Sequence, residues 1–275
     1  MLNVESIFLL AYVAAGTYLC ELAVANGHRA AGIRASGLKD YGFNCNILGD
    51  DPGHLGLGVN GQESKYGQAE GKLSCDGRLA LMEKMQIDFS AAERWLWPQE
   101  ICIQKFIYMT CFRDPISRIK SSLRFHRLQQ PKVVMSWAES NSFNPASPIS
   151  NGSPTVDNFY IRSLSGKSVY TKHLGQITTP DLERAKHILS LFEVVIILEK
   201  LSTRDVVQLA TRLQWSKTSL SFTPKKTGRT TVRALSSEQE KRLRQLNALD
   251  QEFYQHADRQ AAEISAKCSQ NALNI

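Results

Sequence analysis

Four short segments of the chain have the apolar character expected of β-strands. They cover residues 6–13, 86–92, 105–112 and 192–199. The first, third and fourth are nearly continuous apolar runs, which are typical of strands whose sheet is covered by helices on both faces. Between and after these segments the apolar spacing changes to the helical period. The pattern therefore predicts strands that alternate with helices.

Helical periodicity predicts six helices, at residues 17–26, 77–85, 115–127, 180–191, 203–214 and 237–265. Gly27 follows the first helix as its C-cap. Thr179 precedes Pro180 as the N-cap of the fourth helix, and Ser236 begins the last. Alternating strands and helices imply an α/β fold of three layers, in which helices flank a largely parallel central sheet.

The chain of 275 residues is expected to form a single domain. Two segments, at about 39–76 and 128–157, are rich in Gly, Asn, Asp, Pro and Ser, and are predicted to be long surface loops. Residues 7–25 are mostly apolar, so a membrane span is the alternative there. Gly16 interrupts that run and no basic segment precedes it, which favours a strand, a turn and a helix.

The formal net charge of +7 favours anionic partners such as nucleotides. No run of Lys or Arg is longer than two, and no basic stripe alternates with aromatic residues, so nucleic-acid binding is not predicted. The six cysteines lack CxxC spacing, so no metal site is expected. Cys20 and Cys111 are predicted to be buried thiols, and one pair among Cys45, Cys75 and Cys102 to be bridged if the chain folds in a lumen.

Two predicted strand-to-helix junctions carry candidate chemistry. The first, Ala14-Ala-Gly-Thr17, is a turn of small residues that directs main-chain N–H groups of the following helix toward one spot, as a phosphate requires. It lacks the Gly-Lys-Ser/Thr of a P-loop kinase. In the second junction Arg113 ends a strand, Asp114 and Pro115 begin a helix, and Ser121 lies two turns farther on. An arginine at the carboxyl end of a strand suits an anionic ligand.

Three motifs resemble those of a known family. Arg113-Asp-Pro-x-x-Arg-x-x-Ser121 resembles the 3′-phosphate motif of carbohydrate-type, often Golgi-resident sulfotransferases, which use 3′-phosphoadenosine 5′-phosphosulfate (PAPS). Ala15-Gly-Thr-Tyr18, after an apolar strand, is similar to the family's 5′-phosphosulfate loop. The segment 158–166 resembles its Asn-x-x-x-Arg-x-Leu-x-Gly motif. The three occur in the family's order over roughly residues 6–255.

The resemblance implies a P-loop NTPase-like fold of the sulfotransferase type, with PAPS as sulfuryl donor, no metal, and a hydroxyl acceptor on a glycan. It implies the Golgi lumen or membrane as the location, and the alternative is a soluble, cytoplasmic protein. Arg113 and Ser121 would hold the 3′-phosphate. Arg162 would face the nucleotide or the acceptor, and the alternative is an arginine on a helix surface. The residues implied at the 5′-phosphosulfate are Ala15, Gly16, Thr17 and Tyr18.

One position departs from the family's pattern. Val13 stands where the family has a lysine that neutralises charge on the leaving phosphate. Three explanations are open: a lysine elsewhere substitutes, the protein binds the nucleotide without efficient catalysis, or the N-terminal stretch is an altered or shortened form of a longer chain. A transferase also needs a base for the acceptor hydroxyl. Glu93 is the first candidate and His54 the second, with His126 as the third.

Overall fold

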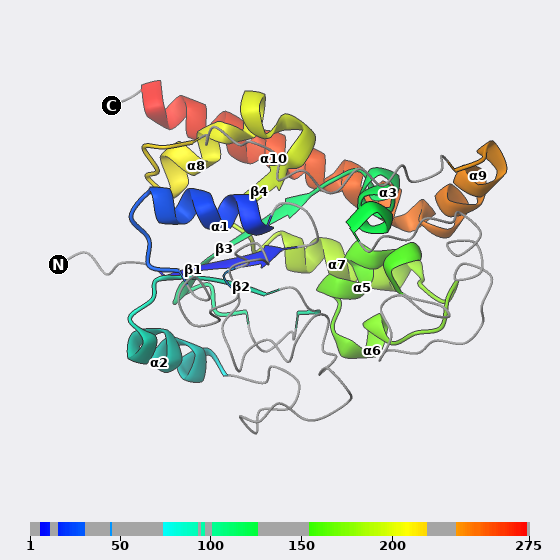
Figure 1. Cartoon of the computed structure of the whole chain (residues 1–275), viewed down its shortest axis with the longest axis horizontal. Helices are drawn as coiled ribbons and strands as arrows, with labels where there is room; N and C mark the ends of the chain where they lie inside the picture. Colours follow the sequence, from blue (N-terminus) through cyan, green and yellow to red (C-terminus); the bar gives the residue numbers. More distant parts are fainter. Residues whose placement is uncertain are drawn as a thin grey trace.

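The computed structural model describes residues 6–11, 16–30, 45, 74–92, 95–96, 101–125, 154–218 and 235–273. Its centre is a four-stranded sheet in the order β2-β1-β3-β4, and all three pairings are parallel (Figure 1). The strands are β1 (Ser6–Ala11), β2 (Phe89–Ala92), β3 (Phe106–Phe112) and β4 (Val194–Ile197). The predicted α/β fold with a parallel sheet is confirmed.

The side chains of β3 are buried at every position, as its apolar run predicts. Successive side chains point to opposite faces of the sheet. Phe106, Tyr108 and Phe112 enter one core cluster, whereas Ile107 and Met109 enter the other. Helices therefore cover both faces, which explains why the strand carries almost no polar residue.

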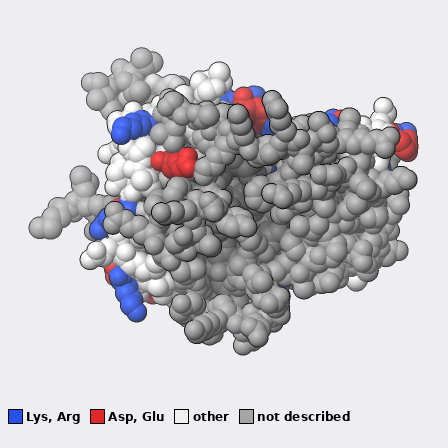
Figure 2. Space-filling view, viewed as in Figure 1, with Lys and Arg blue, Asp and Glu red and all other residues white. Residues whose placement is uncertain are grey.

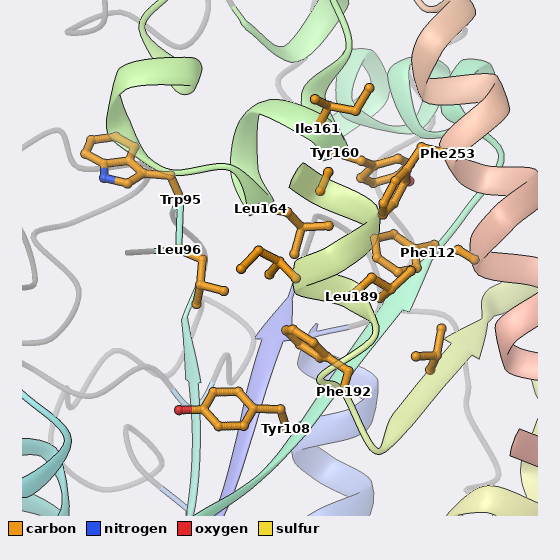
Figure 3. Close-up of a cluster of buried hydrophobic side chains, with 14 of the residues drawn as sticks. Trp95, Leu96, Tyr108, Phe112, Tyr160, Ile161, Leu164, Leu189, Phe192 and Phe253 are labelled. Atoms are coloured by element: carbon orange, nitrogen blue, oxygen red, sulfur yellow. The ribbon is translucent and has the colours of Figure 1, made fainter. Parts of the chain in front are cut away.

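The described helices whose side chains enter the core of the first face include α5 (Phe159–Leu164), α7 (Thr179–Leu189) and α10 (Ala248–Leu273). Figure 3 shows their side chains packed over the sheet, with Phe253 of α10 against Phe112 of β3. The second face is covered by α1 (Gly16–Ala25) and α8 (Val206–Arg212). The predicted strand and helix at the N-terminal end of the chain are thus confirmed as β1 and α1, and Gly27 ends α1 with a positive φ of 91°.

The remaining elements are α2 (Cys75–Met85), α3 (Pro115–Phe125), α6 (Lys167–Tyr170), α9 (Ser237–Leu246), 3-10 helices at Pro154–Val156 and Leu198–Lys200, and a π-helical turn at Leu201–Asp205. No helix in the described part of the chain is both long and apolar enough to span a membrane.

Two details of the helix prediction were wrong. The N-cap of α7 is Thr178 rather than Thr179, because Asp181 accepts hydrogen bonds from the main-chain N–H and the hydroxyl of Thr178. The single helix predicted at 237–265 is divided into α9 and α10 at Asn247. The Asn247 side chain donates to the main-chain oxygen of Val156 and accepts from the N–H of Asn158, so tertiary contacts hold this break.

Two disulfides join segments that are distant in sequence. Cys20 is bonded to Cys45, and Cys75 to Cys102. The prediction of a free thiol at Cys20 was therefore wrong, and two pairs rather than one are bridged. Cys20 and Cys45 are 25 residues apart in the sequence, and no local pattern indicates which distant cysteine the fold brings to Cys20. Cys111 is free and buried, as predicted, and burial raises the pKa of its thiol.

Candidate functional site

The two strands that precede the predicted junctions end at the same edge of the sheet. β1 and β3 are adjacent and parallel, with Ala11 paired to Cys111, so both strands end at this edge. From β1 the chain leads to its neighbour β2 on one side, and from β3 to its neighbour β4 on the other. Such a reversal of connection is the switch point at which open α/β sheets bind ligands, outside the carboxyl ends of the strands.

The turn from β3 to α3 is fixed by the side chain of Asp114. One carboxylate oxygen accepts a hydrogen bond of 2.8 Å from the N–H of Ser117, which caps the N-terminus of α3. The other oxygen accepts one of 3.3 Å from the side-chain amide of Gln251 on α10. Pro115 is the first residue of α3, where its missing N–H costs nothing. The predicted capping role of Asp114 is confirmed.

Arg113 is the first residue after β3 and is held through both its main chain and its side chain. Its N–H donates to the Tyr160 hydroxyl at 3.2 Å, and its carbonyl accepts from the same hydroxyl at 2.7 Å. Its Nε lies 3.6 Å from a carboxylate oxygen of Glu199. The side chain is 35% exposed, so part of the guanidinium remains accessible to a ligand.

Glu199 follows β4 and brings a carboxylate to this turn. It accepts hydrogen bonds of 3.2 Å from the main-chain N–H of Asp114 and from the Tyr254 hydroxyl. Burial, together with the nearby Glu199 charge, raises the pKa of Tyr254, which therefore stays a neutral donor. The Glu199 carboxylate thus balances Arg113 and ties the ends of β3 and β4 together.

Ser121 lies on the more open face of α3. Ser117, Lys120 and Ser121 are half-buried, whereas Ile116 and Ile119 face the core. Ser121 stands six residues beyond Pro115, or about 9 Å along the helix axis at 1.5 Å per residue. It shares its face with Ser117, one turn closer to the capped N-terminus.

Arg118 occupies the buried side of the same helix. Its guanidinium lies 4.4 Å from the ring centre of Phe159 and 5.5 Å from that of Tyr160, and it donates to the main-chain oxygen of Thr155. Two of its nitrogens have no hydrogen-bond partner in the part of the chain that the structure describes. Burial lowers the pKa of Arg118. Arg118 therefore joins α3 to α5 through its contact with the two rings.

Arg162 is a residue of α5 whose side chain is fully buried, with no part of it exposed to solvent. Its Nε and Nη2 donate to the main chain and the carboxylate of Asp157, and its Nη1 and Nη2 donate to the main-chain oxygens of Tyr170, Lys172 and His173. All three nitrogens are thus engaged within the fold. The alternative of a helix-surface arginine was wrong, and its donors are committed to holding α5 and α6 together instead of facing a ligand.

The other predicted site residues are described only in part. Gly16 and Thr17 begin α1 at the switch point, and Tyr18 packs against the core of the second face. Several lie outside the described residues, namely Val13, Ala15, His54, Glu93 and His126. Among the residues that are described, no three His, Cys, Asp or Glu side chains are grouped so as to hold a metal ion.

Charged side chains of both signs are intermixed on the described parts of the face in Figure 2. Three residues that contact the Arg113 turn were not predicted, Tyr160, Glu199 and Gln251. Glu199 ended the predicted strand 192–199, and a carboxylate at the carboxyl end of a buried strand is a signal for this edge. Tyr160 carried no such signal. No protein-family model and no curated protein matches this chain.

Proposed function

We propose that the chain is a single-domain, P-loop-like sulfotransferase that binds PAPS at the switch point between β1 and β3. The observation that carries the proposal is that the strands before the two junctions, β1 and β3, are adjacent and parallel and end at that point. Arg113 offers positive charge for the 3′-phosphate, and Ser121 offers a hydroxyl. Gly16, Thr17 and Tyr18 at the start of α1 suit the 5′-phosphosulfate.

In the proposed reaction an acceptor hydroxyl oxygen forms a bond to the sulfur of PAPS. The bond from sulfur to the 5′-phosphate oxygen breaks, and 3′-phosphoadenosine 5′-phosphate (PAP) leaves. Glu93, or else His54, takes the hydroxyl proton. A glycan is the proposed acceptor, and the two disulfides support folding in an oxidising lumen such as that of the Golgi.

Arg113→Ala tests the nucleotide site. A hydrogen bond to a charged group contributes about 1.5–3 kcal/mol, so PAP affinity should fall at least about tenfold. Calorimetry with PAP measures the change. Arg184→Ala is the matched control, because Arg184 is exposed on α7, away from the β3–α3 turn. Unchanged PAP affinity in Arg113→Ala would refute the proposed site.

A second function, nucleotide binding without efficient turnover, is favoured by Val13 at the position of the expected lysine. Under this alternative the wild-type protein binds PAP but transfers little sulfate from PAPS to glycan acceptors. Val13→Lys should then raise the transfer rate, because the added charge stabilises the leaving phosphate. Rapid transfer by the wild-type protein would exclude this alternative.

A further inference from the structure

The hydroxyl of Tyr160 bridges both main-chain polar groups of Arg113. It accepts from the Arg113 N–H at 3.2 Å and donates to the Arg113 carbonyl at 2.7 Å. Arg113 lies just beyond the last residue of β3, where the hydrogen bonds of the sheet end. The hydroxyl therefore holds the strand end at the point where the chain turns toward α3.

Tyr160 is itself fixed in place by its surroundings. Its side chain is fully buried, and its ring packs edge-on against Phe112 with the centres 5.1 Å apart (Figure 3). Its main-chain N–H donates to Asp250 at 3.0 Å, so the first turn of α5 is anchored to α10. Burial raises the pKa of the Tyr160 hydroxyl, which therefore keeps the proton that it donates to Arg113.

The contact also assigns a role within the segment 158–166. Arg162, the residue of this segment expected to reach the ligand, uses all three nitrogens inside the fold. Tyr160, two residues earlier, is the side chain of α5 that reaches Arg113. The link between this segment and the ligand site therefore runs through a tyrosine hydroxyl.

We propose that Tyr160 is a positioning residue, whose hydroxyl orients Arg113 toward the 3′-phosphate of the nucleotide. This inference rests on the proposed function. The hydroxyl fixes the peptide groups on both sides of the Arg113 Cα atom. It thereby fixes the point from which the Arg113 side chain extends, relative to the capped N-terminus of α3. Prior placement of a charged group raises affinity because binding then orders fewer bonds.

Tyr160→Phe removes the hydroxyl and keeps the ring that packs on Phe112. We expect PAP affinity to fall about tenfold, as for the loss of a buried hydrogen bond. Affinity for adenosine 5′-phosphate, which lacks the 3′-phosphate, should stay within about twofold. Calorimetry with both nucleotides separates loss of 3′-phosphate recognition from general loosening of the site.

Tyr108→Phe is the matched control. Its hydroxyl is also buried and accepts a main-chain hydrogen bond of 2.9 Å from Cys102, which precedes β3 and lies at the opposite end of that strand from Arg113. It should lower the melting temperature without changing PAP affinity. A second readout needs no nucleotide, since hydrogen exchange of the Arg113 amide should accelerate at least about tenfold in Tyr160→Phe and stay unchanged in Tyr108→Phe.

The outcomes separate this inference from the proposed function. If Arg113→Ala weakens PAP binding while Tyr160→Phe does not, the positioning role is refuted and the site stands. An equal loss of affinity for both nucleotides in Tyr160→Phe would also overturn it. If Arg113→Ala leaves PAP binding unchanged, the proposed function fails. An unchanged exchange rate at Arg113 in Tyr160→Phe refutes the positioning role independently of any ligand.

Discussion

The stability of this protein should depend on pH through one buried carboxyl group. Asp250, near the start of α10, accepts main-chain hydrogen bonds from Tyr160 at 3.0 Å and Ile161 at 3.1 Å. Burial raises the pKa of Asp250 from 3.8 to about 6, and the Asp157 charge adds to the rise. The two hydrogen bonds and the charge of Arg118 oppose it without cancelling it.

The sign follows from the proton affinity of the two states. Because the pKa is higher in the folded protein, the folded state holds the proton through the window from about pH 4 to about pH 6, whereas the unfolded chain has lost it. The contribution of Asp250 to the free energy of unfolding therefore decreases as the pH rises through this window. At about 1.4 kcal/mol for each pKa unit, the decrease amounts to about 3 kcal/mol.

Asp250→Asn keeps the size of the side chain and removes the titrating group. Urea unfolding of both proteins, at several pH values from about 4 to 7, should show the wild type losing about 3 kcal/mol relative to the variant. Asp76→Asn is the control, because Asp76 is 83% exposed on α2. A difference between wild type and Asp250→Asn that stays constant over this range would refute the reasoning.

Two further predictions concern the connections between distant segments. Replacing both Cys75 and Cys102 by Ser should lower the free energy of unfolding by about 3–4 kcal/mol, because the bond restricts a loop of 27 residues in the unfolded chain; urea unfolding checks this, and a loss below about 1 kcal/mol would contradict it. Asn247→Ala should cost about 2–4 kcal/mol, since it leaves the N–H of Asn158 and the oxygen of Val156 unpaired in the interior; an unchanged melting temperature would count against it.

Some features of the turn around Arg113 were predictable from the sequence, and others were not. The capping by Asp114 and the helix start at Pro115 were predictable, because both depend on residues within a few positions of one another. The position of the turn at the edge of the sheet followed from the buried strand before it. The ion pair with Glu199 was not predictable, since it needs β4 to lie beside β3.

Arg162 shows the opposite case. Arg162 lies in the segment 158–166, which resembles a motif of a known family, so its side chain was predicted either to contact a ligand or to lie exposed on a helix. The structure buries it instead, with Asp157 as its ionic partner and main-chain oxygens around it. The local sequence does not distinguish an arginine that contacts a ligand from one that connects two helices. The distinction depends on which main-chain carbonyl groups the tertiary fold places around the guanidinium.

The amino-acid sequence alone determined the strands, most helices and the two strand-to-helix junctions, since apolar periodicity and capping residues act over one or two turns. Only the tertiary structure decided the strand order that brings the junctions together, the partners of the cysteines, and the contacts that hold Arg113. Tyr160 lies 47 residues from Arg113 in the sequence, and Glu199 lies 85 residues from Asp114. Contacts at such separations arise from the packing of whole elements against one sheet, which no short pattern of residues specifies.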